Sequence, residues 1–158
     1  MADFPYHLRP VCHIHMESEI PAEVIGPTPA GLRANFFISR GEVRGERIRG
    51  IVRPQGCADW ALIRPDDVVE ADVRLTIETH DAALIYVTYT GLALLGSGGS
   101  EKLKNGRPLA SVVPIRIAAR MASGNPAYRW VNGAQFLGVG ATHTDPITIV
   151  DYDIYELA

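Results

Sequence analysis

The chain contains 158 residues, of which 47% are hydrophobic and 21% are charged, and its formal net charge is −3. This composition is typical of a globular protein and excludes a mostly disordered chain. The acidic balance also argues against nucleic acid or an anionic membrane as the main partner. The length suits a single domain that spans residues 1–158 and buries its core without disulfides or metals.

The cysteine content and the first residues indicate the subcellular location of the protein. Only two cysteines occur, Cys12 and Cys57, which favours a reducing compartment. The opening segment, MADFPYHLRP, has no basic stretch followed by an apolar one, so we expect no signal peptide. The longest apolar stretch, residues 83–95, is too short to cross a bilayer and is interrupted by threonines. We therefore expect a cytoplasmic protein.

The first half of the chain alternates between apolar and polar residues with a period of two, which is typical of strands. Three prolines in residues 19–31 predict a segment without regular structure. The two segments after it are predicted to pair through a turn that contains Gly41 and Gly45. The predicted strands of this half are residues 8–17, 32–41, 46–54 and 59–65.

The second half continues the same alternation. The sequence THDA, residues 79–82, predicts a tight hairpin between two long strands. The segment GSGGSEKLKNGRP, residues 96–108, predicts a flexible insertion, either a mobile lid or a plain surface loop. Residues 124–132 predict a single helical turn. The predicted strands of this half are residues 68–79, 83–95, 109–120, 134–144 and 146–157.

This pattern places the protein in the all-β class. Eight to ten antiparallel strands with turns at this spacing, and at most one short helical turn, favour a closed or nearly closed barrel or a sandwich. Closure would also remove exposed strand edges. The sequence contains no internal repeat and no linker between domains.

The order of the motifs resembles domain-of-unknown-function family three-two-three-seven, a family of small, mainly bacterial, lipocalin-like barrels. The motifs are GPTPAGLRANFFISRGEVRGERIRGIVRPQGCADW, DVVEADVRLTIETHDAALIYVTYTG, NPAYRWVNGAQFLGVG and VDYDIYEL, and they extend from Gly26 to Leu157. The family usually has a glycine where Ala82 follows the aspartate of the hairpin, so a different turn type is expected there. The resemblance implies a barrel and homo-oligomers, and it transfers no settled activity.

The segment VVEADVRLTIET, residues 68–79, poses the main question about function. One face is aliphatic, and the other carries Asp72 and Arg74. If the aliphatic face filled the interior, the lumen would be dry and without a site; if the polar face pointed inward, both charged side chains would line a pocket. Lysines occur only in the long loop, at Lys102 and Lys104, although plain surfaces usually carry more of them. We therefore expect the polar face to line the pocket.

The last predicted strand offers the same choice, because Asp151, Asp153 and Tyr155 share one face. In a pocket, Asp72 would stay charged beside a guanidinium group and would remove a proton from an acidic carbon or phenol. Tyr155 would donate a hydrogen bond to the developing oxyanion, and Asp153 would return the proton. These roles predict an isomerase, cyclase or lyase that acts on a small aromatic or conjugated carbonyl compound.

Further side chains are candidates for binding the ligand. Aromatic rings would supply flat walls, although most aromatic residues in such a domain are simply core. Asp59 and Asn132 have an alternative role, which is to fix a turn through backbone hydrogen bonds. The predicted ligand-binding residues are Arg33, Asp59, Trp60, Arg74, Tyr86, Arg116, Trp130 and Asn132.

Three alternatives remain open from the sequence. The first is a barrel that binds a small hydrophobic molecule without transforming it. The second is a protein with a purely structural or assembly role, which would have a filled lumen. The third is a metal site built on His13 and His15, although a third ligand of known spacing is missing, so we expect no metal. We also expect no cofactor, because neither a dinucleotide fingerprint nor a phosphate loop occurs.

Overall fold

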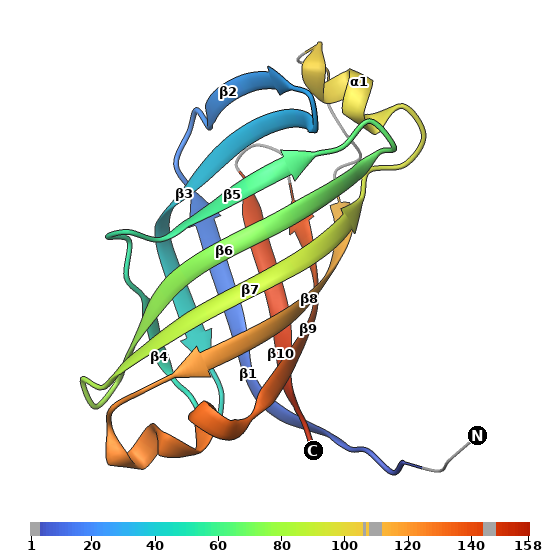
Figure 1. The fold of residues 1–158 in the computed structure, drawn as a ribbon. Coiled ribbons are helices and arrows are strands. Elements are labelled where there is room, and N and C mark those ends of the chain that lie inside the picture. The colour runs from blue at the N-terminus through green and yellow to red at the C-terminus, as the bar shows by residue number, and fades with distance from the viewer. Residues whose placement is uncertain (1–3, 106, 108–111, 144–147) are drawn as a thin grey trace.

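The computed structural model describes residues 4–105, 107, 112–143 and 148–158. Ten strands and two short helical segments follow one another along the described chain (Figure 1). The elements are β1 (Leu8–Ser18), β2 (Glu23–Thr28), β3 (Gly31–Arg44), β4 (Gly50–Val52), β5 (Ala58–Ile63), β6 (Val68–Thr79), β7 (Leu84–Leu94), α1 (Gly99–Lys104), β8 (Val112–Ala122), η1 (Pro126–Gly133), β9 (Gln135–His143) and β10 (Ile149–Leu157).

The strands close into an antiparallel barrel, which confirms the predicted fold class. The sheet follows the order β1-β10-β9-β8-β7-β6-β4-β3, and β1 pairs with both β10 and β3, so the first and last members of this series meet. Two strands lie off the closed series. β2 extends the edge beyond β3, and β5 bridges β3 and β6 beside β4.

The alternation of side chains explains why these strands close around a core. On β8, the inward residues Val113, Ile115, Ile117, Ala119 and Met121 are all buried, while the residues between them are exposed. Each barrel strand contributes one apolar face in this way, and burying these faces drives closure.

The two ends of the barrel are covered differently (Figure 1). At one end, η1 lies beside the hairpin between β6 and β7, where the hydroxyl of Tyr128 donates to Asp81 at 2.8 Å. At the other end, α1 is held by Asp67, whose carboxylate accepts the backbone N–H groups of Gly98 and Ser100 at 2.8 and 2.9 Å. Within the described ranges, neither helical segment has the length and apolarity needed to cross a membrane.

Four local expectations need correction. Residues 19–31 include a strand, β2, because Pro27 lies on a sheet edge where its missing N–H is harmless. Gly41 lies inside β3 and not in a turn; a Cβ there would come within 2.8 Å of Val52 on β4, so glycine permits this close pairing. The insertion at 96–108 contains the helix α1. With η1, this makes two short helical segments where at most one was expected.

Candidate active site

The polar face of β6 lies outside the barrel, so the predicted orientation of this strand is wrong. Ala71, Val73, Leu75 and Ile77 point inward and are at most 2% exposed. Burying four aliphatic side chains stabilises the fold more than withdrawing an ion pair from water would. Asp72 and the neighbouring Arg74 instead form an exposed pair on the outer surface, with oxygen and nitrogen 3.4 Å apart.

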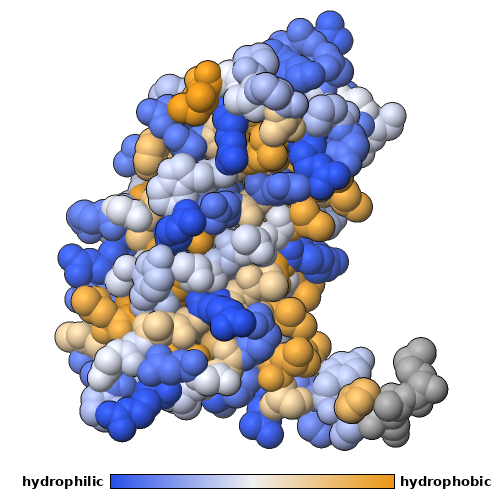
Figure 2. Space-filling model, in the orientation of Figure 1, coloured by the Kyte–Doolittle hydropathy of each residue, from blue (hydrophilic) through white to orange (hydrophobic). Residues whose placement is uncertain are grey.

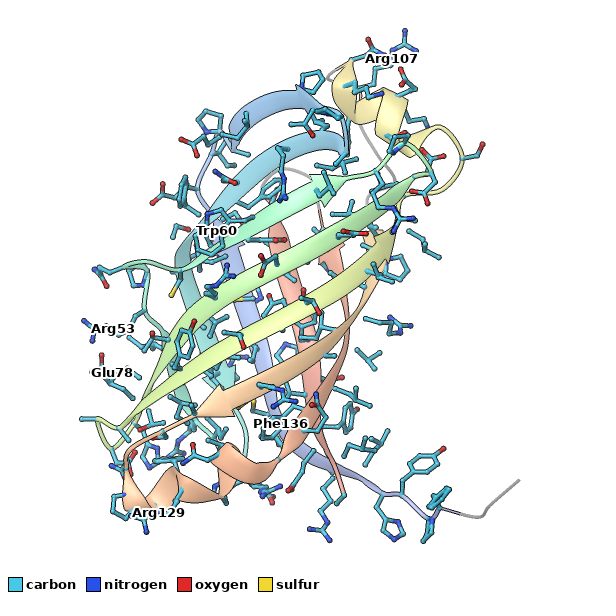
Figure 3. The ribbon with its side chains drawn as sticks, viewed as in Figure 1. Arg53, Trp60, Glu78, Arg107, Arg129 and Phe136 are labelled. Carbon is cyan, nitrogen blue, oxygen red and sulfur yellow. The ribbon has the colours of Figure 1, made fainter. Side chains whose placement is uncertain are left out.

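An inward aliphatic face does not make the lumen solid, as the sequence argument assumed. The half of the lumen nearer α1 contains a cavity of about 560 Å³. Ala61, Ala71 and Ala93 occupy inward positions on β5, β6 and β7 around it, and their methyl groups leave space that larger residues would fill. Toward η1, larger side chains fill the interior. Leu75 and Phe136 are among the largest fully buried side chains, and Figure 3 shows Phe136 at this end of the barrel.

Asp59 brings a carboxylate into this cavity. It lies on β5 on the same face as Ala61 and Ile63, and its Oδ1 accepts the backbone N–H of Asp72 at 3.0 Å. The backbone pairing between β5 and β6 is interrupted at Trp60 and Ala61. At this interruption the Asp59 carboxylate takes the place of a backbone carbonyl as the acceptor for the Asp72 N–H. The other carboxylate oxygen, Oδ2, accepts no hydrogen bond from the residues that the structure describes.

The environment of Asp59 makes its carboxyl group a weaker acid than usual. Burial raises the pKa of this group to about 6. The backbone hydrogen bond from Asp72 partly opposes this effect, and the charge on Asp72 adds to it. At neutral pH the group is mostly ionised, and its pKa is close enough to 7 for it to take up a proton and release it again.

Two tyrosines complete the polar part of the cavity. Tyr89 on β7 and Tyr152 on β10 meet edge to face, with ring centroids 5.6 Å apart, and both are at most 5% exposed. Burial raises the pKa of each hydroxyl well above its ordinary value, and the negative charge of Asp59 raises both further. The hydroxyls therefore stay protonated and can donate hydrogen bonds to a ligand.

The predicted catalytic residues do not share a pocket with one another. Asp153 is exposed and accepts a hydrogen bond from His13 Nδ1 at 2.9 Å. Tyr155 lies on the same outer face of β10. Strands β7, β8 and β9 lie between β6, which carries Asp72, and β10, which carries Tyr155. These four strand spacings of about 4.8 Å each amount to roughly 19 Å along the barrel wall.

A shallow groove on the outside of β5–β8 does bring three predicted residues together. Arg33, Asp72 and Arg116 line this groove, whose volume is about 660 Å³, on a face where apolar and polar side chains are interspersed (Figure 2). Both guanidinium groups are already engaged with backbone. Arg33 donates to the Trp60 carbonyl at 3.0 Å, and Arg116 donates to the Ile115 carbonyl at 2.8 Å. The groove therefore offers few free polar groups to a ligand.

The other predicted ligand-binding residues also lie outside the cavity. The ring of Trp60 faces Arg74 on the outer surface at 5.3 Å, and Tyr86 is 48% exposed there. Trp130 belongs to η1 and stacks under Arg47 at 3.7 Å. Asn132 bonds both the N–H and the carbonyl of Ser123, which is the turn-fixing role considered as its alternative. Of all the predicted site residues, which the structure describes in full, Asp59 alone lines the cavity.

Three of the five histidines, His13, His15 and His143, form a cluster on the outer surface of β1, β9 and β10. Asp151 accepts a hydrogen bond from His15 at 2.8 Å and lies 3.3 Å from His13 and 3.7 Å from His143. Within the described parts of the chain, no group of three or more such side chains has an arrangement suited to a metal ion.

Sequence reasoning missed Tyr89 and Tyr152, although the alternation contained a signal. Tyr89 shares its face with Ile85, Val87 and Ala93, and Tyr152 shares its face with Val150 and Ile154. A hydroxyl-bearing ring in an otherwise aliphatic row marks a position where the interior is polar. Asp59, between Cys57 and Ala61 on its own face, gives the same signal.

A family model described as "Protein of unknown function (DUF3237)" matches residues 6–157. A UPF0311 protein of Rhodopseudomonas palustris is 36% identical over 133 residues, which is 84% of each chain. A UPF0311 protein of Bradyrhizobium diazoefficiens is 32% identical over the same share.

Solved structures share the fold along nearly the whole chain. A conserved protein of unknown function from Rhodopseudomonas palustris is 29% identical, with a TM-score of 0.82 over 99% of this chain and 100% of that one. A beta-barrel like protein from Acinetobacter baumannii is 24% identical, with a TM-score of 0.82 over 99% of each chain. A structure described as an enzyme from Penicillium herquei is 18% identical, with a TM-score of 0.70 over 100% of this chain and 98% of that one, and this likeness concerns the fold alone.

Proposed function

The chain belongs to the DUF3237 family of proteins of unknown function, and we propose that it is a cofactor-free acid/base enzyme of the isomerase, cyclase or lyase type. Its substrate is a small aromatic or conjugated carbonyl compound bound in the lumen. The observation that carries this proposal is the Asp59 carboxylate, which lies in an apolar cavity with a pKa of about 6 beside two protonated tyrosines. One barrel of this fold is described as an enzyme, so the architecture is compatible with catalysis.

Asp59 takes the role of the base. The hydrogen bond from the Asp72 N–H fixes Oδ1, which leaves Oδ2 to remove a proton from a carbon next to a carbonyl group or from a phenol. The same carboxyl group then returns the proton to another atom of the conjugated system. Moving the proton in this way shifts a double bond, closes a ring or releases a leaving group. The substrate is neither oxidised nor reduced overall.

Tyr89 and Tyr152 stabilise the negative charge that proton removal creates. Their hydroxyls stay protonated because burial and the neighbouring carboxylate disfavour the phenolate. A hydrogen bond from either hydroxyl to the substrate oxygen becomes stronger as that oxygen turns into an enolate or phenolate. The apolar surroundings exclude water, which strengthens this interaction further.

The proposal is tested by proton exchange in deuterated water. The wild-type protein is incubated with an aryl diketone, and exchange at the carbon between the carbonyl groups is followed by proton NMR. The variant Asp59→Asn keeps the shape and the hydrogen bond to Asp72 but removes the base, so we expect a loss of roughly 100-fold or more. The matched variant Asp72→Asn changes the same group on the outer surface and should lose less than about twofold.

Two results would argue against catalysis at this site. Equal exchange by wild type and Asp59→Asn would show that the carboxylate is not the base. Tight binding of the diketone without accelerated exchange would favour the alternative, a barrel that binds a small hydrophobic ligand without transforming it; the mostly apolar lining of the cavity is consistent with that role.

A further inference from the structure

The cavity has ionisable groups of opposite charge at different depths. Among the described residues that line it, Asp59 carries the negative charge and Arg107 carries the positive charge, and most of the others are apolar. Asp59 lies at the level of the tyrosine pair, because it stands opposite Val73 on β6, and Val73 stands opposite Tyr89 on β7. Arg107 follows α1 at the α1 end of the barrel, far from Arg129, which belongs to η1 at the opposite end (Figure 3).

This separation determines where a charged ligand group is stable. An anionic group beside Asp59 would meet a second negative charge in apolar surroundings, which is costly. The same group near Arg107 would meet a cation and would remain in contact with water, because Arg107 is exposed. The deep end therefore selects a neutral carbonyl or phenol, and the α1 end selects an anion.

The region between the two ends is suited to an apolar body. Phe36, Val69 and Ile115 come from three different strands and give the cavity apolar walls. The volume of about 560 Å³ lies within the range of small-molecule sites.

We propose that the ligand is an amphipathic organic anion that binds in one orientation. Its acid group lies beside Arg107 at the α1 end, its apolar body fills the alanine-lined region, and its carbonyl or phenol end meets Asp59 and the tyrosines. This proposal rests on the proposed function in one respect, which is that the group bound beside Asp59 is a carbonyl or phenol.

The test uses two fluorescent probes of the same shape. Anilinonaphthalene sulfonate carries an anion, and phenylnaphthylamine is the same ring system without it. We expect Arg107→Gln to weaken binding of the sulfonate roughly threefold to fivefold, the range of an exposed ion pair, and to change binding of the neutral probe by less than about 1.5-fold. High salt should weaken sulfonate binding to the wild type more than to this variant.

Two controls locate the effect. Lys102→Gln removes the same charge from α1 at a position that does not line the cavity, and it should leave both affinities unchanged. Ala61→Leu narrows the cavity and should weaken both probes equally. Equal sulfonate affinity for wild type and Arg107→Gln, an equal loss with Lys102→Gln, or no sulfonate binding to the wild type would overturn the proposal.

The two proposals can fail separately. An anion preference that depends on Arg107 in a protein without any proton exchange would refute the enzymatic role and keep the binding orientation. Proton exchange that depends on Asp59, together with equal binding of both probes by wild type and Arg107→Gln, would refute the binding orientation and keep the enzymatic role.

Discussion

The substitution Asp59→Asn should stabilise the protein at neutral pH. Folding moves this carboxyl from water into an apolar cavity, where burial raises its pKa from 3.8 to about 6. Between these two values the folded protein holds a proton that the unfolded chain has released. Stability therefore falls as the pH rises through this window, and the full penalty is present above about pH 6.

The size of the penalty follows from the shift in pKa. The rise from 3.8 to about 6 corresponds to about 3 kcal/mol, at roughly 1.4 kcal/mol for each pH unit. Asparagine has no charge to bury, and its side-chain oxygen can still accept the N–H of Asp72. We expect Asp59→Asn to be about 3 kcal/mol more stable than wild type at pH 8, and the two proteins to become equal as the pH approaches 4.

The assay is urea unfolding of both proteins at several pH values, with the difference in free energy of unfolding plotted against pH. Other titrating groups cancel in this difference. The matched control, Asp72→Asn, removes a carboxylate from the exposed pair with Arg74 and should lose at most about 1 kcal/mol at any pH. A difference for Asp59→Asn that does not change between pH 4 and pH 8 would refute the reasoning about burial of this carboxylate.

Two further predictions concern the ends of the barrel. Phe136 is fully buried toward η1, so Phe136→Ala should cost about 3–5 kcal/mol in urea unfolding. Tyr86→Ala on the outer surface should cost less than about 1 kcal/mol. Similar losses for Phe136→Ala and Tyr86→Ala would contradict the conclusion that large side chains fill the half of the lumen toward η1. At the other end, Asp67→Ala should speed hydrogen exchange at residues 98–104 and leave η1 unchanged, because the carboxylate of Asp67 anchors α1. Asp67→Asn, which keeps an acceptor and tolerates the φ of 64°, should show a smaller effect, and unchanged exchange in Asp67→Ala would contradict this anchoring.

The strands could be predicted from the sequence because alternation is a local property. The predicted bounds of β6, residues 68–79, are those observed. The face that points inward could not be read from one strand, because both faces of β6 have a plausible environment. Closure of the whole barrel decides it, since the inward faces must together form one apolar interior.

The candidate site depended on contacts between distant segments and was therefore harder to predict. Asp59, Tyr89 and Tyr152 come from β5, β7 and β10, and only the barrel brings them together. The predicted roles of Asp72 and Tyr155 relied on neighbours within one strand, whose side chains share a face without sharing a pocket. The helix α1 escaped prediction for a similar reason, because six residues need the distant anchor Asp67 to stay helical.

The alanines around the cavity make its size adjustable. Ala61, Ala71 and Ala93 project into the hollow from three different strands. Adding or removing a few methyl groups at these positions would change which molecules fit, while the backbone hydrogen bonds that hold the barrel together stay in place. Single substitutions at these positions would thus change the volume of the hollow and keep the same scaffold.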